Sequence, residues 1–271
     1  MPTQLTKKGT LFLIGGAEDR NRDRRVLKQL IKRTYPASVA IIPTASYYPN
    51  DVHRCYDEVF LNLGVSTVHC LDIRYRDEAD RPEHLDLLKT ADLIYFSGGD
   101  QSKLVDTLID TKLFSQIKKR FETDGLHIAG TSAGASAIGD PIFYDGDRRG
   151  LEKGSINSSQ GFGLIGGVAV DTHFTARNRL ERLCQFLISG ACSKGIGLDE
   201  DTGIIVDSHL HFEVIGTGMV TVVNSTHVTG SNYTTAKAGE RLRFNNMRVG
   251  YLPPGSRFSI KKWSILTRSE S

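Results

Sequence analysis

Leu126-His127-Ile128-Ala129-Gly130-Thr131-Ser132-Ala133-Gly134 is an apolar run that ends in a turn between two glycines. A short, continuously apolar run predicts a strand buried on both faces, as in a parallel sheet. The residues that follow, 134–138, are mostly small and suit a closely packed helix. The stretch therefore predicts a buried strand that passes through a sharp turn into a helix.

Similar apolar runs recur earlier in the chain, separated by segments with helical spacing. Two of them also end in glycine pairs, at Gly15-Gly16 and Gly98-Gly99. The runs predict strands at 11–14, 39–42, 65–71, 93–96 and 126–129, and the intervening spacing predicts helices near 26–31, 52–63, 104–109 and 113–121. Alternating strands and helices predict an α/β fold, a doubly wound and mostly parallel sheet with helices on both faces.

The last third of the chain has a different pattern. Short apolar segments at 203–206, 211–215 and 220–223 are separated by turn residues, and 240–260 continues in the same way. This pattern is typical of antiparallel strands. We expect 203–271 to be an antiparallel β extension that covers or extends the sheet. Because no linker, repeat or low-complexity segment interrupts the sequence, we expect 1–271 to form a single domain.

The composition is that of a globular protein. The chain has 271 residues, of which 39% are hydrophobic, and a net charge of +3. This small charge gives no signal for nucleic acid or a membrane surface, and no run approaches the ~18 apolar residues of a membrane span. The first eight residues contain no apolar segment, so we expect a cytoplasmic protein. The cysteines form no CxxC pair, which predicts inert, mostly buried thiols and no metal site at Cys55, Cys70, Cys184 and Cys192.

Ligands of parallel sheets bind beyond the carboxyl ends of the strands, which directs attention to 15–19, 97–101 and 130–134. The last of these segments fits the G-x-S-x-G pattern, with Ser132 at its centre. Such an elbow holds its central residue in a strained conformation that exposes the hydroxyl, and N–H groups at the helix start can stabilise an oxyanion. The alternative is a tight packing turn without chemistry.

A serine nucleophile needs a base and an acid that orients the base. Among the eight histidines, His173 is the best candidate because it follows the turn in a polar stretch, whereas His127 lies within a strand pattern and is expected to be structural. The turn Asp199-Glu200-Asp201 offers three acids, and the residues alone leave the choice between them open. The order serine, histidine, acid excludes an ordinary α/β-hydrolase.

Three arginines follow His173 closely, at Arg177, Arg179 and Arg182. Guanidinium groups bind carboxylates through paired hydrogen bonds, so this cluster predicts an anionic group on the ligand. The alternative is a solvated basic helix end with Glu181 as a partner.

Taken together, these segments resemble the cyanophycinase family of serine peptidases and, more distantly, the aspartyl dipeptidases of the same clan. The matching segments occur in the family's order and span most of the chain: 14–19, 42–46, 96–101, 130–134, 171–174, the three arginines, 197–202 and 252–255. The set is far more specific than any one of its parts.

The resemblance implies a class I glutamine-amidotransferase-like (flavodoxin-like) fold, no cofactor or metal, and a homodimer. It implies that Ser132 is the nucleophile, His173 the base and Glu200 the orienting acid, with Gly99 and Ala133 supplying oxyanion N–H groups. The substrate-pocket positions that it implies are Gln101, Asp171, Thr172, Arg177, Arg179 and Arg182. Thr172 is a departure, because the best-known members have Gln there, and a shorter side chain alters substrate preference.

The family substrate is cyanophycin (multi-L-arginyl-poly-L-aspartate), which carries an arginine on each β-carboxyl of its aspartate backbone. The resemblance therefore implies a serine exopeptidase that releases β-Asp-Arg dipeptides through an acyl-enzyme on Ser132. Its partner would be the polymer or a β-aspartyl peptide, and neither nucleic acid nor membrane. One alternative is an aspartyl or isoaspartyl dipeptidase that acts on short peptides. A binding module without catalysis is a second, and the filled serine, histidine and glutamate positions argue against it.

Overall fold

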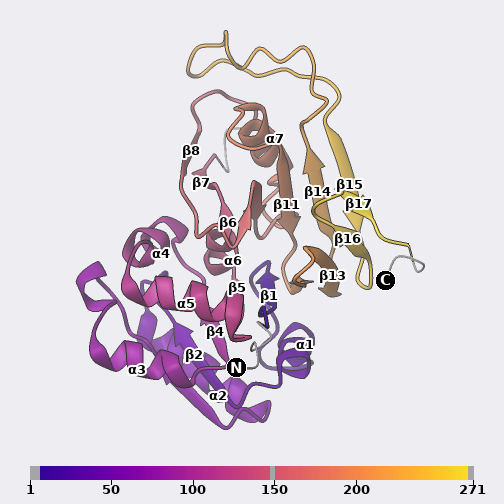
Figure 1. Ribbon diagram of the computed structural model, residues 1–271. Coiled ribbons are helices and arrows are strands. Elements are labelled where there is room, and N and C mark those ends of the chain that lie inside the picture. The colour runs from indigo at the N-terminus through magenta and orange to yellow at the C-terminus, as the bar shows by residue number, and fades with distance from the viewer. Residues whose placement is uncertain (1–6, 147–149, 268–271) are drawn as a thin grey trace, which may run out of the picture.

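The computed structural model describes residues 7–146 and 150–267 and arranges them around two β-sheets and a hairpin (Figure 1). The larger sheet has nine strands in the order β17-β16-β13-β12-β1-β5-β4-β2-β3. Its parallel part consists of β1 (Leu11–Ile14), β5 (His127–Thr131), β4 (Leu93–Phe96), β2 (Ser38–Ile42) and β3 (Thr67–Cys70). The predicted doubly wound, mostly parallel sheet is confirmed.

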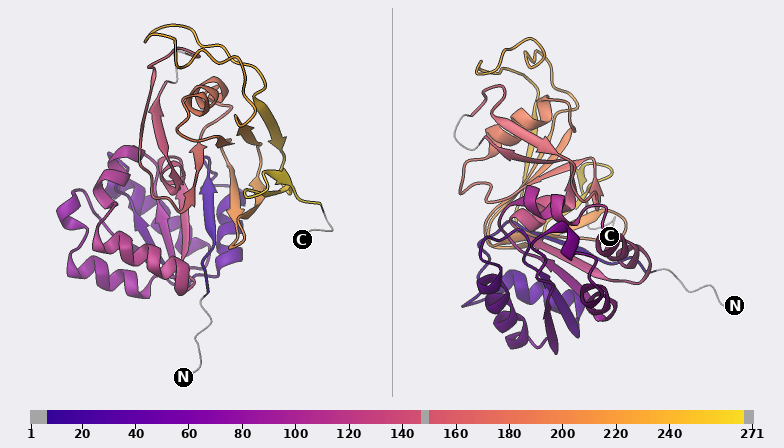
Figure 2. Two further views of the ribbon diagram at one scale, coloured as in Figure 1. Left: turned by 45° about the horizontal axis from the view of Figure 1, so that its top comes forward. Right: turned by 90° about the vertical axis from the view of Figure 1, so that its left-hand side faces the viewer.

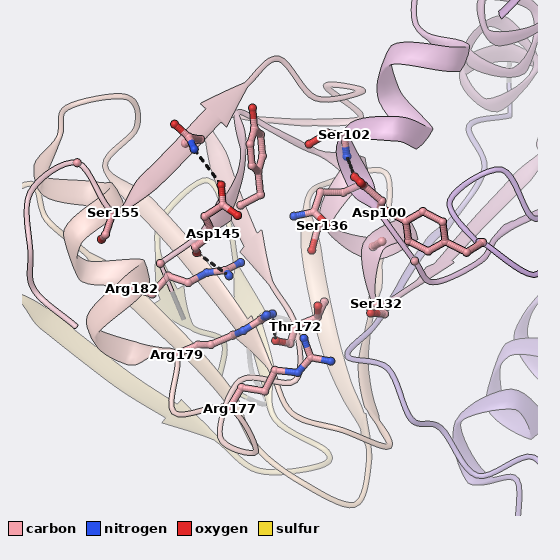
Figure 3. Close-up of a pocket in the computed structure, with 18 residues that line it drawn as sticks. Asp100, Ser102, Ser132, Ser136, Asp145, Ser155, Thr172, Arg177, Arg179 and Arg182 are labelled. Carbon is pink, nitrogen blue, oxygen red and sulfur yellow. Dashed lines mark hydrogen bonds between the residues drawn. The ribbon is translucent and has the colours of Figure 1, made fainter. Parts of the chain in front are cut away.

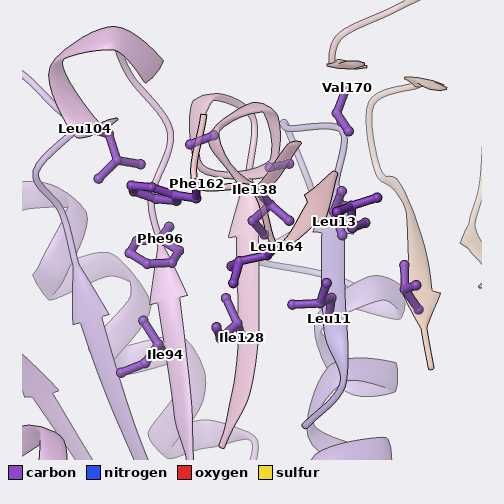
Figure 4. Packing of buried hydrophobic residues seen from close by; sticks show 14 of the residues in the cluster. Leu11, Leu13, Ile94, Phe96, Leu104, Ile128, Ile138, Phe162, Leu164 and Val170 are labelled. Carbon is purple, nitrogen blue, oxygen red and sulfur yellow. The ribbon is translucent and has the colours of Figure 1, made fainter. Parts of the chain in front are cut away.

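Helices cover both faces of this sheet because its strands are apolar on both sides. On β1, Leu13 packs with residues of α3–α6, whereas Phe12 and Ile14 pack with residues of α1 and α2. Figure 4 shows the first of these cores, where Phe96 and Ile128 lie below Leu104 and Phe162. The helices are α1 (Arg25–Thr34), α2 (Pro49–Asn62), α3 (Pro82–Thr90), α4 (Gln101–Leu108), α5 (Lys112–Thr123) and α6 (Ala133–Ile138), with a short 3₁₀ turn at Arg76–Glu78.

One helix, α3, is absent from the sequence prediction. Its buried residues are His84 and Leu88 only. Two buried positions in a helix of this length give too little periodicity for the pattern to be recognised.

The predicted antiparallel extension is confirmed on the β1 side of the sheet. There β12 (Thr202–Val206) pairs antiparallel with β1 and places Ile204 opposite Leu13. The sheet then continues through β13 (His211–Gly216), β16 (Arg257–Ser259) and β17 (Ser264–Ile265).

A second, six-stranded sheet was not foreseen from the sequence. Its order is β15 (Arg248–Leu252), β14 (Val220–Asn224), β11 (Lys194–Leu198), β10 (Val168–Asp171), β6 (Gly139–Asp140) and β9 (Ile165–Gly166). Helix α7 (Leu180–Ile188) packs on it through Leu183 and Phe186, and the hairpin of β7 (Ile142–Asp145) and β8 (Ile156–Ser159) lies beside it. Figure 2 shows α7 and most of this sheet above the parallel strands of the larger one.

The thiols are free, and Cys184 is buried whereas the other three are half-buried. Burial raises the pKa of Cys184 to about 12 and that of Cys70 to about 11. Across the ranges that the structure describes, no helix combines the length and the apolar character needed to span a bilayer. The same ranges contain no group of three or more His, Cys, Asp or Glu side chains suited to holding a metal ion.

Candidate active site

Ser132 stands alone between β5 and α6, in a strained backbone conformation with φ 52° and ψ −116°. The turn requires glycine on both sides, because neighbouring backbone atoms leave no room for a side chain at either position. A Cβ on Gly130 would lie 2.4 Å from the carbonyl of Gly134, and a Cβ on Gly134 would lie 2.3 Å from the carbonyl oxygen of Phe96. The turn therefore has the geometry of a nucleophile elbow, with the hydroxyl at the carboxyl end of a central strand.

Two further side chains line up with this hydroxyl. His173 Nε2 lies 2.9 Å from Ser132 Oγ, and His173 Nδ1 lies 2.7 Å from Glu200 Oε1. A carboxylate only accepts hydrogen bonds, so Nδ1 carries the proton that faces Glu200. The lone pair of Nε2 therefore faces the serine hydroxyl, which is the arrangement of a base ready to take its proton.

The three residues come from different sheets. Ser132 follows β5 of the larger sheet, whereas His173 and Glu200 each follow a strand of the second sheet. Those strands, β10 and β11, are parallel neighbours with Asp171 opposite Gly197, so both side chains leave the same edge. The site forms where the two sheets meet.

The three acids of the turn 199–201 differ in their hydrogen-bond partners. The carboxylate of Asp199 accepts the N–H groups of Thr175 and Met219, both at 3.0 Å. The carboxylate of Asp201 accepts the N–H of Asp19 and the hydroxyl of Thr217. Of the three acids, only Glu200 reaches the imidazole.

The two expected oxyanion donors lie beside Ser132. A Cβ on the neighbouring Gly98 would lie 3.7 Å from Ser132 Oγ, so this loop passes directly against the serine. Gly99 has φ +142°, and a Cβ there would lie 2.0 Å from the carbonyl oxygen of Ala45, so only glycine fits. Ala133 is the first residue of α6, and its N–H has no acceptor within the helix.

A cavity of about 970 Å³ opens beside Ser132 (Figure 3). Five of the six pocket residues that the resemblance implied line this cavity: Gln101, Thr172, Arg177, Arg179 and Arg182. Gln101 is the first residue of α4, and its side-chain amide donates to the carbonyl oxygen of Phe143 at 2.9 Å. That bond ties the loop of Gly99 to the β7–β8 hairpin.

Asp171 does not line the cavity, although the resemblance implied a pocket role for it. Its side chain is 1% exposed, and its Oδ1 accepts hydrogen bonds from Arg179 and Arg182, each at 3.1 Å. Each arginine also donates to a carbonyl oxygen, that of Thr172 or of Asp145. The aspartate therefore fixes two buried guanidinium groups from behind, while the side chain of Arg177 is exposed.

The far wall of the cavity contains residues that sequence reasoning missed. They lie on the β7–β8 hairpin, where Asp145 Oδ2 accepts a hydrogen bond from Asn157 Nδ2 at 2.8 Å. Tyr47, which is 73% exposed, lines the cavity from the loop after β2. No motif or hydrophobic period marks these positions, so only the folded chain brings them to Ser132.

Comparisons with known proteins place the chain in a family. The model of Peptidase family S51 matches residues 11–213. The protein called cyanophycinase from Trichormus variabilis is 34% identical over 269 residues, covering 98% of this chain and 90% of its own. The cyanophycinase of Synechococcus elongatus is 33% identical and covers 95% of this chain and 81% of its own.

Solved structures are similar as well. The crystal structure of a peptidase from an acI-B1 actinobacterium is 28% identical, with a TM-score of 0.65, over 81% of this chain and 91% of its own. That of a putative peptidase E protein from Listeria monocytogenes is 18% identical, with a TM-score of 0.51, over 77% of this chain and 97% of its own, and shows the shared fold alone. On the family match and the near full-length relatives, the chain belongs to peptidase family S51.

Proposed function

We propose that this peptidase hydrolyses cyanophycin to β-Asp-Arg dipeptides through an acyl-enzyme on Ser132. One observation carries the proposal: the aligned Ser132–His173–Glu200 set opens into a cavity whose wall carries three guanidinium groups. The relatives named cyanophycinase, which match nearly the whole chain, support the choice of substrate.

Each of the three residues has a role in the proposed reaction. His173 Nε2 takes the proton of the Ser132 hydroxyl as Oγ attacks the substrate carbonyl, and then returns it to the leaving amine. Glu200 stabilises the imidazolium that forms between these steps. The N–H groups of Gly99 and Ala133 stabilise the oxyanion, and water then hydrolyses the acyl-enzyme.

The pocket matches a substrate that carries both signs of charge. Free carboxylates of the terminal unit pair with Arg177 at the surface and with the rigid guanidiniums of Arg179 and Arg182. The guanidinium of the substrate needs a carboxylate, and Asp171 is buried and already bound to two arginines. The exposed Asp145 on the cavity wall fills this role instead.

We further propose that the protein is a cytoplasmic homodimer. The family resemblance supports the dimer. Light scattering on the purified protein tests the dimer, because a mass near twice 29.9 kDa is expected.

Product analysis by mass spectrometry tests the function. Wild type, Ser132→Ala and Ser115→Ala are each mixed with purified cyanophycin; Ser115 is an exposed serine on α5 and serves as the matched control. We expect β-Asp-Arg from wild type and Ser115→Ala and none from Ser132→Ala. If none of the three proteins releases product from cyanophycin but wild type still cleaves short β-aspartyl peptides, the polymer is not the substrate and the enzyme is a dipeptidase for short peptides.

A further inference from the structure

The loop 14–18, which begins at the last residue of β1, contacts all three segments of the proposed catalytic set. Successive carbonyl groups of this loop each accept one backbone N–H. The bonds join Ile14 O to Ser132 N (2.9 Å), Gly15 O to His173 N (2.9 Å) and Gly16 O to Asp201 N (3.0 Å). Because Asp201 adjoins Glu200, this one loop sets the relative positions of nucleophile, base and acid.

A buried carboxylate anchors the same loop. Glu18 is 4% exposed and lies two residues after the last of these carbonyls. Its Oε2 accepts the hydroxyl of Thr131 at 2.6 Å, and its Oε1 accepts the hydroxyls of Tyr95, at 2.8 Å, and Tyr56. Thr131 immediately precedes Ser132, so the anchor joins the loop to the elbow itself.

The three hydroxyl donors explain how this group is buried. A buried carboxylate is costly unless hydrogen bonds replace its water, and hydroxyls from α2, β4 and β5 converge on this one. Burial and the adjacent carboxylate raise the pKa of Tyr56 and of Tyr95 well above the usual range, so both remain donors. The guanidinium of Arg20 lies 5.7 Å from the ring centroid of Tyr56, at the outer side of the cluster.

We propose that Glu18 is a positioning residue for catalysis, which holds the loop 14–18 against β5 so that its carbonyl groups fix Ser132, His173 and the acidic turn. The inference rests on the proposed role of Ser132. Glu18 does not touch the reacting atoms, and it acts through Thr131 and the backbone. Its loss therefore lowers the rate of attack by Ser132 more than it lowers the affinity for substrate.

Two changes of graded size test this role. Thr131→Val keeps the side-chain shape and removes one donor, and Thr131→Ser retains that donor and should rescue the activity. Glu18→Gln replaces one accepting oxygen by an amide that cannot accept. The control is Thr111→Val, because Thr111 is also buried and its hydroxyl donates to Leu108 O at 2.7 Å at the start of α5, away from the cavity.

The main measurement is the second-order rate at which a fluorophosphonate labels Ser132, since this rate does not depend on knowing the substrate. Small misplacements of reacting groups cost up to ~10²-fold, so we expect about tenfold slower labelling for Thr131→Val and about 100-fold for Glu18→Gln. Thr131→Ser and Thr111→Val should label within about twofold of wild type. With cyanophycin, kcat should fall in the same order while KM stays constant.

Thermal melts of every variant separate this role from a merely structural one. Thr111→Val and Thr131→Val should both melt at lower temperature, and only Thr131→Val should label slowly. Wild-type labelling rates in folded Thr131→Val and Glu18→Gln would overturn the inference and leave the proposed function intact. A wild type that neither labels at Ser132 nor cleaves any β-aspartyl substrate would overturn both.

Discussion

Replacing Gly16 by alanine should separate the proposed base, His173, from the proposed nucleophile, Ser132, without substituting either residue. A Cβ at position 16 would lie 2.5 Å from His173 Nε2 and Cε1 and 3.2 Å from Ser132 Cβ. Ordinary van der Waals contact begins at 3.4 Å, so the imidazole must move by roughly 1 Å. The 2.9 Å hydrogen bond between Ser132 and His173 lengthens beyond hydrogen-bond range as a result.

The size of the effect follows from this displacement. A misplacement of about 1 Å costs about 100-fold in kcat, which corresponds to about 2.7 kcal/mol of activation free energy. Because Gly16 also has φ +91°, the alanine adds backbone strain of about 1–2 kcal/mol to the folded state. The melting temperature should therefore fall by several degrees in addition to the loss of rate.

Gly64 provides a matched control. It has φ +92°, and a Cβ there would meet nothing within 4 Å. Gly64→Ala therefore carries the same backbone strain without the contact to His173. The assay compares kcat, KM and the fluorophosphonate labelling rate of both variants with wild type, alongside thermal melts.

We expect similar losses of melting temperature in the two variants and a loss of kcat in Gly16→Ala alone. If Gly16→Ala keeps a kcat within about threefold of Gly64→Ala, the imidazole tolerates the methyl group and our reasoning about this contact is wrong.

Three other changes have defined outcomes. Glu200→Gln should lower kcat by about 10³–10⁴-fold because it removes the carboxylate that orients the imidazole, whereas Asp199→Asn should lower the melting temperature with kcat nearly unchanged; steady-state kinetics of both variants checks this. Asp145→Asn should raise KM for the arginine-bearing polymer by about tenfold with kcat unchanged, and an equal loss on poly-aspartate would count against a guanidinium contact. Burial raises the pKa of Cys184 to about 12 and that of Cys70 to about 11, so their thiolate fractions at pH 8 are only about 10⁻⁴ and 10⁻³. Both thiols should therefore resist iodoacetamide at pH 8 and react faster as the pH rises. Mass spectrometry of the labelled protein measures this reaction.

The parallel half of the larger sheet was predictable because each strand carries its own signal. The run 93–96 is continuously apolar and ends in a glycine pair, and such local features survive in the fold. His127 was likewise predicted as structural, and its Nδ1 accepts the N–H of Thr10 at 3.1 Å. The turn at Ser132 was recognisable for the same reason, since the whole G-x-S-x-G pattern lies within the five consecutive residues 130–134.

The second sheet and the far wall of the cavity were not predictable in this way. The partners of β11 lie far away along the chain in opposite directions. Lys194 pairs with Val168, 26 positions earlier, and Leu198 pairs with Val220, 22 positions later, and no short pattern encodes that choice. The acidic turn was ambiguous because three consecutive acids are chemically alike. In the folded chain Asp199 accepts the N–H groups of Thr175 and Met219, whereas Glu200 is hydrogen-bonded to His173. Asp145 could be recognised as a residue of the site only from the structure, in which the β7–β8 hairpin places it across the cavity from Ser132.

The division of the proposed catalytic set between two sheets also bears on when, during synthesis, the chain gains peptidase activity. During synthesis the serine emerges well before the acid, and at about 5–20 residues per second the roughly 70 residues between them take several seconds to add. Until residues 202–206 arrive, β1 also lacks its antiparallel neighbour and forms an open sheet edge. The nascent polypeptide should therefore remain inactive until these late strands dock, and hydrolytic activity would report that they have docked.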